Sequence, residues 1–305
     1  MTYRVRRPLL ALVAASMLFG GAVTGTKYAL RGFDPVTLLS VELVAAAGVL
    51  WAVLLVRGYR PTRSWWLPVL LGLLEPALAY LADTVGLTMT SAVDGAVISG
   101  LESALVIILA ALLLREPVTQ PALWAIVVAL GGLVVLAGSG AGRGSATGDL
   151  LLAGGMLSGS LYTVLAKRFS DGSDVLSLTA WQFAVAALVG LPFTLLRWAS
   201  GAESPPVAVA PRYWVVALLV GVGGYGLSFL LFNQAIVSVD AGWAALVLNL
   251  IPVFGLLSAV ILLGEGVTRN EAIGALLIGS SVLYFTIADR REARPGPQGV
   301  AEPAA

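Results

Sequence analysis

Long apolar runs alternate with short polar breaks along almost the whole chain. Each run has roughly the 20 residues that a helix needs to cross the hydrocarbon layer of a membrane. The breaks carry turn-forming or charged residues, as at Asp34-Pro35, Arg60-Pro61 and Glu116-Pro117. We predict an all-α multipass membrane protein with ten transmembrane helices, at residues 9–30, 35–56, 65–87, 92–114, 121–139, 149–166, 175–196, 213–236, 240–263 and 270–288.

The two halves of the chain resemble each other. Residues 112–119 match residues 261–268 with an offset of 149, which pairs Glu116 with Glu265. Earlier in each half an offset of 140 pairs Glu42 with Gln182 and Lys27 with Lys167. Because five is an odd number of crossings, the second copy of a five-helix unit enters the membrane inverted, as in many secondary transporters.

This repeat sets the expected domain organisation. We expect a cytoplasmic N-terminus at 1–8, a first five-helix repeat at 9–139, a Gly-rich linker at 140–148, a second repeat at 149–288 and a disordered cytoplasmic tail at 289–305. The first apolar run could pass for a signal peptide, but it continues through residues 23–30 and has a counterpart in the second half. Most Lys and Arg fall in the loops on the side of the N-terminus, so both termini are expected in the cytoplasm.

Composition supports this class and excludes others. Hydrophobic residues make up 58% of the chain, charged residues 11%, and the mean hydropathy is +0.93, far from the values of soluble domains. A net charge of +1 without a patterned basic face argues against a nucleic-acid partner. The chain has no Cys and no His, which excludes disulfides and imidazole chemistry, and we expect neither a metal nor a cofactor.

Four carboxyl groups lie inside the predicted third and fourth helices: Glu75, Asp83, Asp94 and Glu102. A carboxylate near the bilayer centre costs at least about 2.5–3.5 kcal/mol, so these residues indicate a polar interior and are the first candidates for substrate and proton binding. Glu75 and Asp83 lie about 12 Å apart along a helix and about 80° apart around it, and Asp94 and Glu102 repeat this spacing. The alternative for Asp83 and Asp94 is a place near the interface or a pairing with Lys27.

Other polar residues within the spans complete the predicted site. Glu42 lies in the second helix. The second half contributes uncharged polar partners, Tyr162, Gln182, Asn233, Gln234 and Asn249, and candidate aromatic walls, Trp181, Tyr225 and Trp243. Acidic residues on one wall and amides and aromatics on the other would suit a cationic or zwitterionic amine.

Residues at the helix ends are expected to have structural or gating roles. Glu116 and Glu265 end helices next to loops, and Lys27 and Lys167 lie where a lysine can extend to the interface. Two small-residue motifs, Gly21-x-x-x-Gly25 and Gly155-x-x-x-Gly159, predict close helix packing. Pro252 is expected to kink the ninth helix.

Several of these segments resemble EamA-type members of the drug/metabolite transporter superfamily. They are Gly20…Lys27, Gly86-Leu87 before Thr90-Ser91-Ala92, Leu112-Leu113-Leu114-Arg115-Glu116, and Ile251-Pro252-Val253-Phe254 before Glu265. The resemblance covers about residues 9–288 and implies two inverted five-helix repeats, a place in the bacterial cytoplasmic membrane, and gradient-driven movement of small metabolites, often export. Two departures are Glu42, where the family often has Arg, and Ser103, where Pro often follows the acidic residue.

The sequence therefore favours a secondary active transporter, proton-coupled and possibly exporting, for small amines, amino acids or drugs. A passive channel or a lipid flippase is the alternative. An intramembrane aspartyl enzyme is a weaker one, because its Gly-x-Gly-Asp motif is absent. The Gly138–Gly144 segment lacks the Lys of a phosphate-binding loop.

Overall fold

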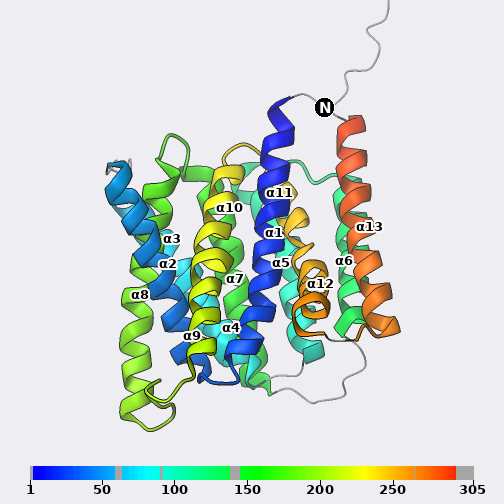
Figure 1. The fold of residues 1–305 in the computed structure, drawn as a ribbon. Helices are drawn as coiled ribbons and strands as arrows, with labels where there is room; N and C mark the ends of the chain where they lie inside the picture. The colour runs from blue at the N-terminus through cyan, green and yellow to red at the C-terminus, as the bar shows by residue number, and fades with distance from the viewer. Residues whose placement is uncertain (1–2, 59–63, 90–91, 138–144, 265, 293–305) are drawn as a thin grey trace, which may run out of the picture.

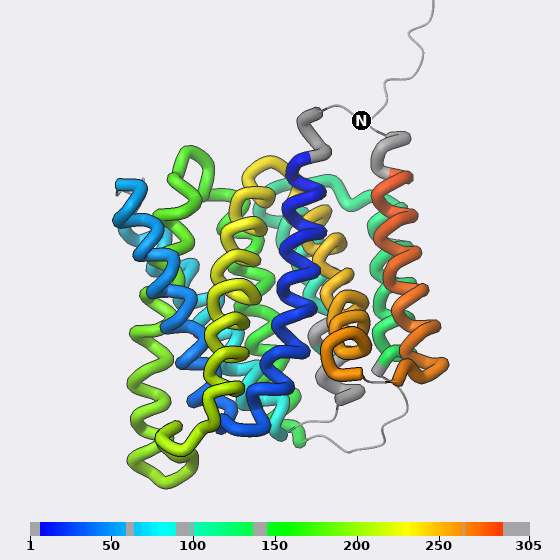
Figure 2. Tube along the Cα trace, in the orientation of Figure 1, coloured from blue at the N-terminus to red at the C-terminus, as the bar shows by residue number. Residues whose placement is uncertain are grey.

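A computed structural model describes residues 3–58, 64–89, 92–137, 145–264 and 266–292, apart from some side chains next to the gaps. The regular structure in these ranges is entirely helical, as predicted. The helices run up and down side by side, and α1 begins at the face where α13 ends (Figure 1). The trace in Figure 2 shows the same path without the ribbon.

Ten crossings of the bundle are formed within the described residues. Seven are single helices: α1 (Tyr3–Ala29), α2 (Pro35–Arg57), α5 (Ala92–Leu114), α6 (Gln120–Ala137), α7 (Ala146–Phe169), α8 (Val175–Ala199) and α13 (Arg269–Glu292). The third crossing is α3 (Trp66–Gly72), η1 (Leu73–Leu78) and α4 (Ala79–Leu87), and the eighth is α9 (Pro211–Leu219), η2 (Val220–Leu227) and α10 (Ser228–Ile236). The ninth is α11 (Ala241–Leu248) followed by α12 (Ile251–Leu263).

The apolar lengths agree with a membrane bundle. Among the described residues, eight crossings are long and apolar enough to span a bilayer, and shorter apolar stretches at Leu101–Leu114 and Gln120–Leu136 lie in the other two. Two predicted boundaries are corrected, because α1 already starts at Tyr3 and α13 continues to Glu292. Membrane thickness limits the apolar part of a helix but not the helix itself, so polar turns extend beyond it.

A pair of close contacts confirms the repeat register. A Cβ atom added at Gly72 would lie 2.6 Å from the backbone oxygen of Gln182, and one added at Gly221 would meet the backbone of Glu42. Gly72 and Gly221 are 149 residues apart, and Glu42 and Gln182 are the pair predicted by the offset of 140. In each half, a glycine of the third helix therefore packs against the second helix of the other half.

The same symmetry relates the helix interruptions. The π-helical segments η1 and η2 occupy equivalent places in the third and eighth crossings. Within η1 the backbone leaves the helical conformation at Glu75, which precedes Pro76. The ninth crossing breaks at Asn249 and Leu250, so the predicted kink at Pro252 occurs two residues earlier, and Pro252 lies in the first turn of α12, where its missing N–H costs nothing.

The crossings pack in a symmetric way around a central core. Helix α7 packs against η1, α4 and α5, while its repeat counterpart α1 packs against η2, α10 and α12. The centre is aromatic: the ring of Phe229 lies 5.1 Å from that of Phe183, 5.8 Å from that of Tyr162 and 5.5 Å from that of Phe19. Tyr162 of this core lies on α7, and residues of α7 also line the candidate functional site.

Candidate functional site

Three of the four predicted intramembrane acids meet in one cavity. Glu75 of η1, Asp83 of α4 and Glu102 of α5 line it together with the α7 face. The other lining residues are Ala79, Leu152, Gly155, Met156 and Gly159. The volume of the cavity is about 20 Å³, which is room for one or two water molecules and not for a metabolite. We call this space the acidic cavity.

The local backbone explains how these carboxyl groups come together. The backbone at Glu75 departs from the helical conformation within an otherwise helical span. The hydroxyl of Ser158 on α7 donates a 2.7 Å hydrogen bond to the carbonyl oxygen of Leu74, which also accepts the backbone N–H of Ala79. A Cβ atom added at Gly159 would lie 2.8 Å from Oε1 of Glu102 and 3.4 Å from Oε2 of Glu75. Two carboxyl groups therefore converge on one glycine of α7.

The carboxyl groups of the acidic cavity have no partner of opposite charge among the described residues. No hydrogen-bond donor or cationic side chain in this part of the chain contacts the carboxyl oxygens of Glu75, Asp83 or Glu102. Coulomb repulsion between like charges is strong where water is scarce, so the three groups cannot all be ionised at once without a bound cation. Protonation or a bound cation would relieve this repulsion.

Glu42 lies apart from this cavity. It is buried on α2, where the hydroxyl of Thr26 donates a 3.0 Å hydrogen bond to its carboxyl oxygen, and Tyr225 is a second hydrogen-bond partner. The ring of Tyr225 packs 5.0 Å from that of Tyr80, one turn from Glu75. Glu42 is therefore satisfied by partners of its own, unlike the acids of the cavity.

The predicted amide wall forms an internal network. The Tyr162 hydroxyl donates a 2.7 Å hydrogen bond to Oδ1 of Asn233. The amide of Asn233 donates to Thr179 at 3.0 Å and to Oε1 of Gln182 at 2.9 Å. All four residues are buried, and Nε2 of Gln182 has no partner in the described residues. The network joins α7, α8 and α10 beside the aromatic core.

The remaining predicted site residues are dispersed. The Asn249 amide donates to the Ser103 hydroxyl at 3.3 Å across the break of the ninth crossing, and Gln234 is exposed on α10. Trp243 lines a second cavity, at one end of the bundle, with a volume of about 70 Å³. Glu116, Asp240 and Phe285 also line this cavity. The side chain of Asp94 lies outside the described residues.

Glu116 caps the start of α11. Its two carboxyl oxygens accept hydrogen bonds from the backbone N–H groups of Ala241, at 3.0 Å, and Gly242, at 3.3 Å, at the start of α11. Burial raises the pKa of Glu116, while these two hydrogen bonds and nearby Lys167 act in the opposite direction. Glu116 thus ties the loop after α5 to the other half of the protein.

The two predicted lysines also lie at helix ends. Nζ of Lys167 donates a 3.2 Å hydrogen bond to the carbonyl oxygen of Val237, just after α10, where a positive charge is favourable. Lys27 is exposed in the last turn of α1. Glu265 lies outside the described residues, so its predicted role stays a prediction.

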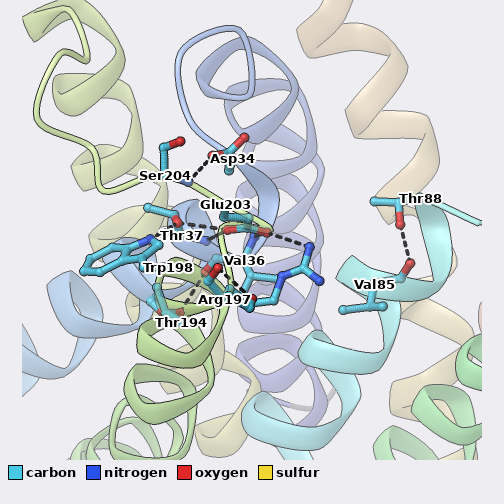
Figure 3. Close-up of polar contacts among 12 residues, drawn as sticks. Asp34, Val36, Thr37, Val85, Thr88, Thr194, Arg197, Trp198, Glu203 and Ser204 are labelled. Carbon is cyan, nitrogen blue, oxygen red and sulfur yellow. Dashed lines mark hydrogen bonds and ion pairs between the residues drawn. The ribbon is translucent and has the colours of Figure 1, made fainter.

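One buried carboxylate was missed by the sequence analysis. Glu203, in the loop between α8 and α9, accepts hydrogen bonds from the backbone N–H groups of Val36, at 3.1 Å, and Thr37, at 2.8 Å (Figure 3). Nη2 of Arg197 lies 3.5 Å from Oε1 of Glu203, and the indole N–H of Trp198 donates a hydrogen bond to the Thr37 hydroxyl. Glu203 therefore holds the N-terminus of α2 against a loop of the second half, at the face opposite to Glu116.

Comparison with known proteins agrees with this architecture. The model of the EamA-like transporter family matches the chain twice, over residues 6–138 and 146–287. The chain belongs to this family. It is therefore a membrane transporter, and each match covers one of the two five-helix halves.

Relatives and a solved structure extend the comparison over nearly the full length. The uncharacterized transporter YyaM of Bacillus subtilis is 26% identical, with 89% of this chain and 91% of the relative covered. The uncharacterized protein PA1977 of Pseudomonas aeruginosa is 29% identical over 95% of this chain and 99% of its own. A protein of known crystal structure shares the fold with a TM-score of 0.76 at 21% identity, covering 93% and 98% of the two chains.

The Glu203 contacts predict a measurable loss of stability. Glu203→Ala would leave two backbone donors and Arg197 without their acceptor, which we expect to cost about 2–4 kcal/mol and to lower the midpoint of thermal unfolding. Ser204→Ala is the matched control, because Ser204 contributes only its backbone N–H, to Asp34. Equal midpoints for the two variants would refute a stabilising role for Glu203.

Proposed function

We propose that this transporter is proton-coupled, moves small cationic or zwitterionic amines across the bacterial cytoplasmic membrane, and exchanges proton and substrate at the acidic cavity. The observation that carries the proposal is the convergence of Glu75, Asp83 and Glu102 within the helical bundle, with no counter-charge among the described residues. Intramembrane carboxyl groups are costly and mark ion or proton pathways by default.

The coupling follows from competition for the same oxygens. A carboxyl group with little access to water is stable when it carries a proton or when a cation neutralises it, and unstable when it carries neither. Binding of one therefore displaces the other. If the cavity opens alternately to each side, protons entering from outside expel an amine, and their release inside restores the site for the next amine.

The acidic cavity is too small for a whole metabolite, with room for one or two water molecules. Glu116 and Glu203 hold helix ends of opposite halves at opposite faces. Opening to one side would require the contacts at that face to loosen. This arrangement supports alternating access more than a continuous pore, which would need a path open at both ends.

The transport test uses Glu75→Gln and Glu102→Gln separately in sealed proteoliposomes with an imposed pH gradient. Each change removes a proton-binding carboxyl group while keeping its shape, so we expect uphill amine transport to fall by at least about tenfold, within the usual range of coupling free energies. Asp171→Asn, in an exposed loop, is the control. Size-exclusion profiles would confirm that the variants fold.

The outcomes of this test separate the candidate functions. Uphill transport with unchanged pH dependence in both variants would overturn the assignment of the cavity. A leak that ignores the gradient would favour a passive channel, and a covalently altered substrate would favour an enzyme.

We propose that both termini face the cytoplasm. Arg57 ends α2 at the face where α1 begins, and Ala202 lies in the α8–α9 loop at the opposite face (Figure 1). The chain has no native cysteine, so single cysteines report cleanly. Arg57→Cys should react with an impermeant thiol reagent only from the cytoplasm and Ala202→Cys only from outside. The reverse pattern would invert the proposed orientation.

A further inference from the structure

The floor of the acidic cavity is a glycine face of α7. The atoms nearest to a Cβ added at Gly159 would all belong to the carboxyl groups of Glu102 and Glu75. A Cβ at Gly155 would meet Oδ1 of Asp83 and would lie 3.2 Å from the carbonyl oxygen of Ala79. At Gly154, the next residue, a Cβ would meet nothing within 4 Å.

These contacts differ from those of the packing glycines elsewhere. A Cβ at Gly132 on α6 would approach the backbone oxygen of Gly274 on α13 at 2.9 Å, which is the pattern of two closely packed helices. Gly159 instead faces carboxyl oxygens and lines the acidic cavity. The absence of its side chain therefore creates room beside the acids, in addition to the close helix packing predicted for the Gly155-x-x-x-Gly159 motif.

The size and the acceptors of this space match one chemical group. The cavity holds about one or two waters, and the –NH₃⁺ head of a primary amine is of similar size. Such a head carries three N–H donors, and three carboxyl groups converge here. A trimethylammonium head is several times larger and has no N–H to donate.

We propose that the acidic cavity accepts an unhindered primary ammonium head, excludes its N-trimethylated counterpart, and owes this size limit to Gly155 and Gly159. The inference rests on the proposed function, because the same carboxyl groups hold the cation. It adds the substrate's head group and two residues that determine specificity.

The experiment compares two probes, n-butylamine and butyltrimethylammonium, at a pH where both are cationic. Binding to the purified protein is measured by calorimetry, and each probe is tested as a competitor of amine transport in proteoliposomes. Wild type should bind n-butylamine at least about tenfold more tightly than the trimethylated probe, a difference of about 1.4 kcal/mol. Gly159→Ala should bind n-butylamine at least about tenfold more weakly than wild type does. Gly154→Ala should bind it as tightly as wild type does.

A second variant pair protects the test from a folding defect. Gly155→Ala narrows the cavity at Asp83 instead of at Glu102. The double variant Gly159→Ala, Glu102→Asp should regain part of the n-butylamine binding, because the shorter Asp side chain withdraws from the methyl group added at position 159. A role in helix packing alone predicts no such rescue.

The possible results are distinguishable. Equal binding of the two probes by wild type, or wild-type binding by both alanine variants, would overturn the inference while leaving proton-coupled transport intact. Proton-driven transport of the trimethylated probe would also overturn the inference and leave proton-coupled transport intact. No binding or transport of any amine by wild type would instead overturn the proposed substrate class.

Discussion

The cost of a carboxyl group inside a membrane is the constraint on which the rest of this structure depends. Glu75, Asp83 and Glu102 are brought together with no counter-charge among the described residues, and the surrounding elements accommodate them. The non-helical backbone at Glu75 lies beside the cavity, the Ser158 hydroxyl adds a hydrogen bond to the Leu74 carbonyl next to it, and the glycines of α7 let the carboxyl groups approach closely. A bundle designed for stability alone would have filled this position with apolar side chains.

The second half shows what that alternative looks like. The repeat offsets relate Glu75, Asp83 and Glu102 to Gly224, Phe232 and Ile251, and they relate Gly159 to Phe19. Phe232 is buried, and the Phe19 ring packs edge-on against that of Phe229. The place equivalent to the acidic cavity is therefore occupied by apolar groups. The acids of the cavity therefore all come from the first half, and their equivalents in the second half are apolar.

Much of the fold could be predicted because it follows from local signals. Apolar run length determines the crossings, and an offset between two similar segments identifies the repeat, which the contacts of Gly72 and Gly221 confirm. The place of Glu116 beside a loop suggested a structural or gating role, but not that its carboxyl group would meet the start of α11 in the other half. The convergence of the acids was foreseen only in part, since helical spacing places Glu75 and Asp83 on one broad face but cannot say which helix they meet.

Other features depend on contacts between distant parts of the chain. Glu203 looks like an ordinary loop acid, and only the fold brings it to the N-terminus of α2. Glu42 resembles the cavity acids in sequence, yet Thr26 and Tyr225 satisfy it elsewhere. The network of Tyr162, Asn233 and Gln182 in the same way joins three helices whose register the sequence does not specify.

Proton release on substrate binding is the most direct measurement of the exchange at the acidic cavity. Purified protein in weakly buffered lipid nanodiscs would receive a primary amine while a pH indicator follows the solution. Displacement of a bound proton by the cation predicts acidification that saturates with the binding curve and disappears in the Glu75→Gln, Glu102→Gln double variant. Saturable amine binding without proton release, or release that is unchanged in the double variant, would contradict it.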